Sequence, residues 1–244
     1  MTRRNVLLSG IFMAAAIYVT GLYLVTSLPP IRTLIRTTVI GSADITQSFF
    51  LIVSLILILL LGRGRLSQYG FRLCSIKPVL WAILISAGVQ LIMLIVMIAS
   101  VMISGQMPRT GLAGVAPIVG QLGMSLPRTI VSVWLIASTC EEIFYRGLIL
   151  GHLQPLREIG FRFFGLHISL PVIVCALMFG LGHLCLLSMM PPVMVANIVL
   201  ATTIAGFITG YFRESTGSLI PAIVAHMTFN IVGYTVPRLL GGAG

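Results

Sequence analysis

Residues 79–104 read VLWAILISAGVQLIMLIVMIASVMIS and contain no charged side chain. A helix of about 20 apolar residues is long enough to cross the hydrocarbon core of a bilayer, which is about 30 Å thick. A helix on the surface of a soluble protein would instead carry a polar face. The stretch therefore predicts a transmembrane helix.

The composition extends this interpretation to the whole chain. Of its 244 residues, 58% are hydrophobic and 8% are charged, and the mean hydropathy is +1.10. Soluble domains carry about 25% charged residues, and a soluble fold of this length cannot bury so much apolar surface. Soluble enzymes, disordered chains and fibrous repeats are excluded. The predicted fold class is all-α, a polytopic transmembrane helix bundle that forms one integral-membrane domain over residues 1–244.

Seven apolar stretches are long enough to span a bilayer. The first follows Arg3 and Arg4 and is too long for a cleaved signal peptide, so we interpret it as a retained signal anchor. A weaker stretch at residues 111–126 is interrupted by Gly, Pro and Gln, and we expect a re-entrant or interfacial segment there, or an eighth span if it crosses. The seven predicted spans are 5–28, 46–62, 79–104, 129–150, 168–189, 193–212 and 217–237.

The basic residues set the predicted orientation. Fifteen Lys and Arg against five Asp and Glu give a net charge of +10, but the basic residues stand singly in short connecting segments, which is typical of membrane topology and not of nucleic-acid binding. A cytoplasmic N-terminus puts nine of them inside and five outside, as the positive-inside rule favours. The inside set is Arg3, Arg4, Arg63, Arg65, Arg72, Lys77, Arg157, Arg162 and Arg213; the outside set is Arg32, Arg36, Arg109, Arg128 and Arg238.

The four cysteines show no CxxC pair, and three of them lie inside apolar stretches. This pattern is typical of small buried side chains and indicates neither a disulfide framework nor a metal cluster.

Ionisable side chains inside spans are expensive, at about 2.5–3.5 kcal/mol or more each, so each needs a reason. The fourth predicted span contains Glu141, Glu142 and Arg146. Glu142 and Arg146 are four residues apart and share a helical face, which predicts a structural ion pair. Glu141 points about 100° away from Glu142 and lacks that partner. Glu141 is therefore the candidate functional acid.

The last three spans carry further polar side chains. In the fifth span His183 stands four residues after Phe179, beside two glycines, Gly180 and Gly182, which let another helix approach closely. In the seventh span His226 and Asn230 are again four residues apart and face one side. Asn197 in the sixth span has no such companion and predicts a hydrogen bond between helices.

Glu141, His183, His226 and Asn230 together are the groups needed for acid–base hydrolysis of an amide. A carboxylate or imidazole accepts a proton from water, and a histidine or asparagine donates to the developing oxyanion. Two histidines and a glutamate are equally a catalytic zinc set, so Glu141, His183 and His226 are the ligands of a metal-based alternative. Spacing alone does not decide between these two readings.

These residues resemble known motifs. EEIFYRG at 141–147 resembles the EExxxR motif of the CAAX-prenyl-protease and bacteriocin-processing (CPBP) family of intramembrane endopeptidases. FGLGH at 179–183 resembles its FxxxH motif, and the stretch from TGSL at 216–219 to HMTFN at 226–230 resembles its HxxxN motif. The resemblance covers about residues 130–235, so residues 129–237 are expected to form the catalytic helices.

The resemblance implies a glutamic-type endopeptidase without a cofactor, zinc being the alternative. It implies that Glu141 activates water with the help of His183, that His226 and Asn230 stabilise the oxyanion, and that Glu142 and Arg146 support the helix. The implied partners are the lipid bilayer and a hydrophobic or lipidated peptide or protein substrate of the CAAX, pheromone or bacteriocin type.

Two other classes of function stay open. A proton-coupled transporter also uses buried Glu and His, but it is expected to have two related halves, whereas these polar residues lie in one half. A non-catalytic scaffold or immunity protein would keep the same cluster for packing or peptide binding.

Overall fold

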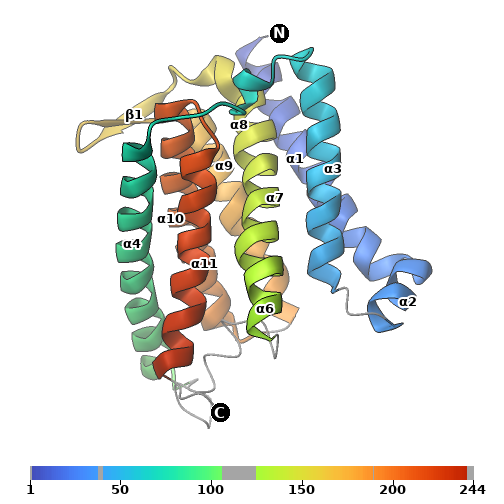
Figure 1. Ribbon diagram of the computed structural model, residues 1–244, viewed down its shortest axis with the longest axis vertical. Helices are drawn as coiled ribbons and strands as arrows, with labels where there is room; N and C mark the ends of the chain where they lie inside the picture. Colours follow the sequence, from blue (N-terminus) through green and yellow to red (C-terminus); the bar gives the residue numbers. More distant parts are fainter. Residues whose placement is uncertain (1, 38–40, 106–124, 189, 241–244) are drawn as a thin grey trace.

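The computed structural model describes residues 2–37, 41–105, 125–188 and 190–240. Long helices run side by side between the two ends of the molecule (Figure 1). Outside the central helix, the helices are α1 (Arg3–Ser27), α2 (Pro29–Thr37), α3 (Ser42–Gly62), α4 (Ile76–Ile103), α9 (Leu170–Gly182), α10 (Pro192–Thr216) and α11 (Ile220–Leu240). Short 3₁₀ turns occupy Leu66–Tyr69, Gln154–Leu156 and His183–Ser188.

The central helix runs without a break over residues 126–153. It consists of α6 (Leu126–Thr129), π-helical turns at Ile130–Ala137, α7 (Ser138–Glu142), further π-helical turns at Ile143–Ile149, and α8 (Leu150–Leu153). Every residue from 142 to 150 is buried. Phe144 stacks on Phe50 of α3 with ring centroids 4.8 Å apart. Glu142 and Arg146 thus lie within the main core and have no exposed surface.

Glycines allow the neighbouring helices to approach closely. A Cβ atom added to Gly206 of α10 would lie 2.7 Å from Cα of Ala176 in α9 and 3.1 Å from Nη2 of Arg146. A Cβ atom on Gly180 would lie 3.0 Å from the Val199 carbonyl oxygen of α10. At Gly182 the hydroxyl of Tyr18 in α1 donates to the glycine carbonyl. The prediction that another helix backbone approaches closely is confirmed at Gly180, whereas at Gly182 the neighbouring atoms belong to the Tyr18 and Tyr145 side chains.

The helical bundle predicted from hydropathy is confirmed. Five helical segments are long and apolar enough to cross a membrane by length and composition: α1, α3, α4, Leu170–Ser188 and α10. The predicted spans at 129–150 and 217–237 are helical but are not among those five. They contain Glu141, Glu142, Arg146 and His226, which are four of the five Glu, Arg and His residues that the sequence analysis names inside spans. The count of seven spans stays a prediction. The weak segment at 111–126 lies almost wholly outside the described residues.

A β-hairpin before α9 was not predicted. Strands β1 (Gly160–Phe163) and β2 (Leu166–Ser169) pair antiparallel, and α9 follows directly at Leu170. The fifth predicted span therefore begins two residues too early. Its hydropathy is continuous with β2, and a hydropathy window does not separate a short apolar strand from the helix that it leads into.

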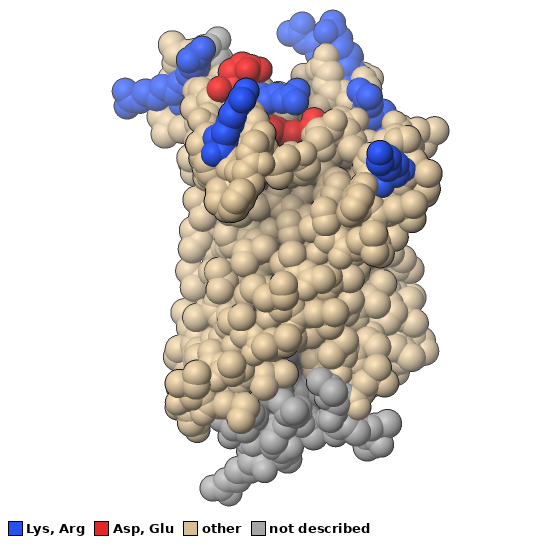
Figure 2. Space-filling view, turned by 90° about the vertical axis from the view of Figure 1, so that its left-hand side faces the viewer, with Lys and Arg blue, Asp and Glu red and all other residues tan. Residues whose placement is uncertain are grey.

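Most of the basic side chains of the described residues lie at one end of the molecule, whereas Arg32, Arg36 and Arg128 belong to α2 and α6 at the other end (Figure 1). Figure 2 shows Lys, Arg and acidic residues above a broad band without charged side chains on the face in view. The N-terminus, the α3–α4 loop, the hairpin and the α10–α11 turn all lie at the same end (Figure 1). These elements carry the nine residues predicted to share one side of the membrane, so the structure agrees with that grouping.

At this end the α3–α4 loop is bound to the α10–α11 turn. Gly70 has φ +91°, and a Cβ atom there would lie 2.9 Å from Cγ of Leu219, so the position requires glycine. The contacts are three hydrogen bonds, from Leu219 N to Gly70 O (2.9 Å), from Ser218 Oγ to Arg72 O (2.6 Å) and from Arg213 Nη2 to Gln68 O (2.8 Å). The loop thereby fixes the start of α11.

Candidate active site

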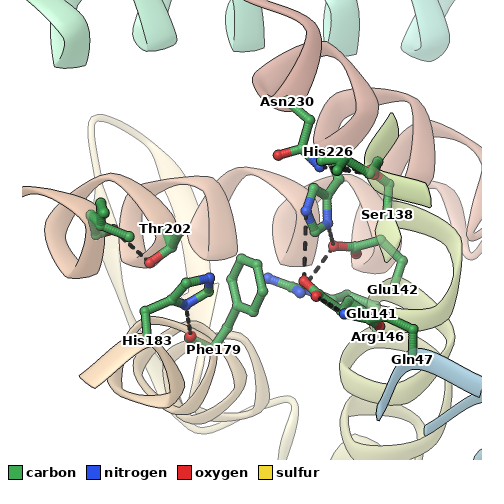
Figure 3. A network of polar contacts seen from close by, with 12 residues as sticks. Gln47, Ser138, Glu141, Glu142, Arg146, Phe179, His183, Thr202, His226 and Asn230 are labelled. Carbon is green, nitrogen blue, oxygen red and sulfur yellow. Dashed lines mark hydrogen bonds and ion pairs between the residues drawn. The ribbon is translucent and has the colours of Figure 1, made fainter. Parts of the chain in front are cut away.

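Three helices position the candidate site residues (Figure 3). Glu141 and Glu142 lie at the end of α7, His183 follows the last turn of α9, and His226 and Asn230 lie on α11. The site thus combines the central helix with two neighbours that carry the second and third sequence motifs.

The predicted ion pair is present. Arg146 Nη1 donates to Glu142 Oε1 at 3.0 Å, and neither side chain has any exposed surface. The guanidinium carbon also lies 4.7 Å from the ring centroid of Phe179 and 5.6 Å from that of Tyr145, so two aromatic faces contact the cation. Because both charges are buried away from solvent, losing either partner would leave the other charge uncompensated, which strongly destabilises a fold.

His226 contacts both glutamates, which the sequence did not predict. Its Nδ1 lies 2.8 Å from Glu142 Oε1, and its Nε2 faces Glu141 Oε2 at 3.7 Å (Figure 3). The carboxylate of Glu142, which also pairs with Arg146, accepts a hydrogen bond from the Nδ1–H of His226 and so fixes the orientation of the ring. The two adjacent acids therefore meet one imidazole from its two sides, although an ideal α-helix would separate their directions by about 100°.

Gln47 of α3 is a site residue that the sequence analysis missed. Its amide nitrogen donates to Glu141 Oε1, while its own amide oxygen is buried and has no hydrogen bond to another described residue. Glu141 is thereby held on one oxygen by Gln47 and faces His226 with the other. A signal existed, because Gln47 is a lone amide in an otherwise apolar predicted span, but nothing in the sequence named its partner.

Phe179 separates the two histidines. Its ring centroid lies 5.2 Å from that of His183 and 5.4 Å from that of His226. His183 Nδ1 bonds to the Phe179 carbonyl oxygen at 2.9 Å, which leaves Nε2 without a hydrogen bond to another described residue (Figure 3). No hydrogen bond or ion pair joins His183 to Glu141 within the described chain, so any cooperation between them requires an intervening molecule.

Asn230 is held by the central helix. Its amide nitrogen donates to Ser138 Oγ at 2.9 Å and, at the longer distance of 3.4 Å, to the Val133 carbonyl oxygen. Ser138 was not predicted as a site residue. Asn230 therefore fixes α11 against the helix that carries the glutamates.

A cavity of about 240 Å³ lies beside these residues, and its walls are mainly apolar. His183, His226 and Asn230 line it, and α4 contributes Met93 and Met97. Glu141 does not line the cavity, but its carboxylate faces the ring of His226, which does. Three of the four predicted catalytic residues thus line one cavity, while Glu141 is bonded to Gln47 of α3.

Asn197 has the structural role predicted for it. Its amide nitrogen donates to Ser100 Oγ of α4 at 2.7 Å and to the Val193 carbonyl oxygen at 2.8 Å. The first of these bonds joins α10 to α4.

The zinc alternative does not fit the side chains as they stand. Within the described residues, no group of three His, Cys, Asp or Glu side chains is arranged to hold a metal ion. Glu141, His183 and His226 lie on two sides of the Phe179 ring, so they do not converge on one point (Figure 3).

Replacing Glu142 with Gln tests the structural role of the ion pair. The change leaves the Arg146 cation buried without a counter-charge, so the free energy of unfolding is expected to fall by about 3–5 kcal/mol, with lower yield. Thermal melting of the purified protein measures the effect. The double variant Glu142→Gln, Arg146→Met is expected to recover part of the loss, because it removes both charges.

The matched control is Asp44→Asn. Asp44 pairs with Arg128 at 3.3 Å, but both side chains are partly exposed, so this variant is expected to lose only about 0–1 kcal/mol. Equal melting temperatures for Glu142→Gln and Asp44→Asn would contradict the assigned role of the buried pair.

A known protein family matches the part of the chain that contains Glu141, His183, His226 and Asn230. Residues 124–232 match the family described as Rce1-like, type II CAAX prenyl endopeptidase Rce1-like. No curated protein and no solved structure matches the chain. The matched segment contains all three motifs, and the match confirms the predicted resemblance to the CPBP family. Residues 124–232, a little under half of the chain, thus match the family model of the Rce1-like type II CAAX prenyl endopeptidases, and the five long apolar helical segments are those of an integral membrane protein.

Proposed function

We propose that this protein hydrolyses a peptide bond in a lipidated or hydrophobic peptide or protein, using a water molecule that Glu141 activates. The observation that carries the proposal is the unequal use of the two adjacent acids. Glu142 is fully buried and is occupied by Arg146 and His226, whereas the Glu141 side chain keeps 17% of its surface exposed. Glu141 is the acid that a water molecule can reach.

In the proposed reaction the Glu141 carboxylate takes a proton from water, and the water oxygen attacks the carbonyl carbon of the scissile bond. The carbonyl oxygen becomes an oxyanion. As the carbon–nitrogen bond breaks, Glu141 passes the proton to the leaving amine, so that the carboxylate is regenerated. His183 assists by accepting a hydrogen bond from the water at its free Nε2.

His226 and Asn230 are the proposed oxyanion donors. Because the Nδ1–H of His226 donates to Glu142, its Nε2 donates to the oxyanion when the ring is the doubly protonated imidazolium. Nε2 lies 3.7 Å from Glu141 Oε2, so base and donor are neighbours. Asn230 uses both amide protons within the protein, and the bond to Val133 O at 3.4 Å is the weaker of the two. Substrate binding exchanges that bond for one to the oxyanion.

The adjoining cavity is the proposed substrate site. Methionine and leucine side chains of α4, together with Phe229 of α11, form much of its wall, and its volume of about 240 Å³ suits an apolar residue or part of a lipid chain. The Rce1-like family supports a CAAX-type substrate for this chain. A metal contributes no step in this proposal.

Glu141→Gln tests the catalytic base. The variant keeps the shape of the side chain and removes the basic oxygen, so it is expected to abolish cleavage of a farnesylated CAAX peptide and to leave the melting temperature nearly unchanged. Asn230→Ala removes one oxyanion donor and is expected to lower kcat by about 10²–10³. Cleavage is measured by mass spectrometry in the presence and absence of a chelator.

Three outcomes of that assay would contradict parts of the proposal. Wild-type turnover by Glu141→Gln would reject the base and favour a scaffold or immunity role. Inactivation by chelator with recovery on adding zinc would favour the metal-based mechanism. If the wild-type protein leaves a farnesylated CAAX peptide intact but cleaves another hydrophobic peptide, the substrate class is wrong and the chemistry stands.

Gln47→Leu tests whether Gln47 positions the base. The variant keeps the bulk of the side chain and loses the donor to Glu141 Oε1, so kcat is expected to fall by up to about 10² while KM changes little. The control is Gln154→Leu, since Gln154 bonds to Glu214 at 3.5 Å and has no contact with the site. Equal kcat values for both variants would show that Gln47 only packs.

We further propose that the charged end faces the cytoplasm, because the nine basic residues there outnumber the five predicted on the other side. A cysteine placed at the exposed Ser67 in the α3–α4 loop tests this. In a background in which Cys74 and Cys185 are serine, a membrane-impermeant maleimide is expected to label that cysteine only after the cells are opened. Labelling of intact cells would reverse the orientation.

A further inference from the structure

The β1–β2 hairpin takes no part in the proposed reaction, and its side chains are unusual for a loop. It reads GFRFFGLHIS over residues 160–169, with three phenylalanines among ten residues. In Figure 1 it extends sideways from the bundle at the end where the N-terminus lies. Its position and composition need a physical explanation.

The register of the hairpin sorts its side chains into two faces. Phe161 pairs with Ile168 and Phe163 with Leu166, while Arg162 pairs with His167. Paired residues, and residues two apart in one strand, lie on the same face of a ribbon. One face is therefore wholly apolar at these positions and the other carries two basic side chains.

The apolar face is covered by protein only near the base of the hairpin. Ile168 packs against the main hydrophobic core, so this face turns toward the bundle. Phe161, which pairs with Ile168, is 52% exposed, and farther out Phe163 and Leu166 are 58% and 46% exposed. The described chain therefore leaves about half of this apolar face uncovered.

The tip adds a residue that the turn itself disfavours. Phe164 and Gly165 join the strands and have φ values of +46° and +79°. A two-residue turn with both φ values positive favours Asn-Gly, and a bulky residue in the left-handed region is strained. Phe164 is nonetheless 91% exposed, and its ring forms a T-shaped pair with that of Phe163, with centroids 4.6 Å apart. Packing within the protein does not explain this phenylalanine.

The hairpin stands where a membrane span begins. Ser169, its last residue, accepts a hydrogen bond from the Val172 N–H and caps α9, and Leu170–Ser188 is one of the five apolar segments. The exposed apolar side chains of the hairpin thus directly precede a segment that is long and apolar enough to cross a membrane. The Lys and Arg side chains at this end (Figure 2) complement the phosphate groups of lipids.

We propose that the hairpin is a membrane-interface anchor, whose partner is the lipid bilayer itself. Phe161, Phe163, Phe164 and Leu166 enter the boundary between headgroups and acyl chains, while Arg162 and His167 face the headgroups and water. Aromatic side chains are favoured at this depth. The anchor fixes the entry point of α9, the helix that carries Phe179 and leads to His183.

Tryptophan scanning of adjacent residues tests the proposal. Phe163→Trp and Arg162→Trp are made in the full chain and reconstituted one copy per nanodisc, in phosphatidylcholine with phosphatidylglycerol; the wild-type signal from Trp81 and Trp134 is subtracted. The Phe163→Trp emission is expected to be blue-shifted and quenched by lipids brominated near the headgroup. The Arg162→Trp emission is expected to be quenched by acrylamide in water and spared by brominated lipid.

A second variant separates anchoring from hairpin stability. Phe164→Asn gives the turn its favoured residue, so a purely structural turn would become more stable. Adding Phe164→Asn to Phe163→Trp is expected to weaken quenching by brominated lipid, because the tip loses its apolar group, while the melting temperature in detergent holds or rises.

Two results would overturn the proposal. Equal quenching of Phe163→Trp and Arg162→Trp by brominated lipid would show that the hairpin does not lie with its apolar face in the bilayer. Shielding of Phe163→Trp that appears in concentrated detergent solution and vanishes in single-copy nanodiscs would assign the face to a second copy of the chain.

Discussion

The Glu142 carboxylate, with no exposed surface, is the constraint on which the site depends. A buried carboxylate needs a counter-charge and hydrogen bonds, and it obtains both from Arg146 on its own helix and His226 on α11. These contacts fix three things at once. They hold the guanidinium against the rings of Phe179 and Tyr145, they orient the imidazole, and they dock α11 onto the central helix. Glu141, one residue earlier, is thereby placed opposite the free side of the same ring.

The acid–base groups are thus supported by residues of very different origin. Glu142 and Arg146 lie on the same helix as Glu141, and His226 lies on α11. Gln47 lies on α3, far outside the segment that matches the Rce1-like family. The tie between Gly70 and Leu219 adds a second link from the first half of the chain to the start of α11. The family segment alone therefore lacks part of the support for its own glutamate.

Sequence reasoning was accurate where local periodicity determines the structure. The spacing of Glu142 and Arg146 predicted their ion pair, hydropathy predicted the helical bundle, and the missing side chain of Gly180 predicted the close approach of another helix. Periodicity assigns faces, however, and does not assign partners. His226 and Asn230 share a face of α11, yet one contacts the glutamates and the other Ser138, because α11 runs antiparallel to α7 and its next turn meets the preceding turn of α7. Gln47 lies 94 residues from Glu141, so only tertiary packing reveals their contact.

The position of α11 in the chain also has a consequence for biosynthesis. The helices leave the ribosome in order, so α3 with Gln47 and α7 with its two glutamates are made before His226 and Asn230. Until α11 arrives, the hydrogen bonds that fix its first turn to the α3–α4 loop are absent, and the imidazole that joins Glu141 to Glu142 is missing. The nascent protein therefore holds an incomplete centre during membrane insertion, and the proposed hydrolysis has to wait until α11 has docked.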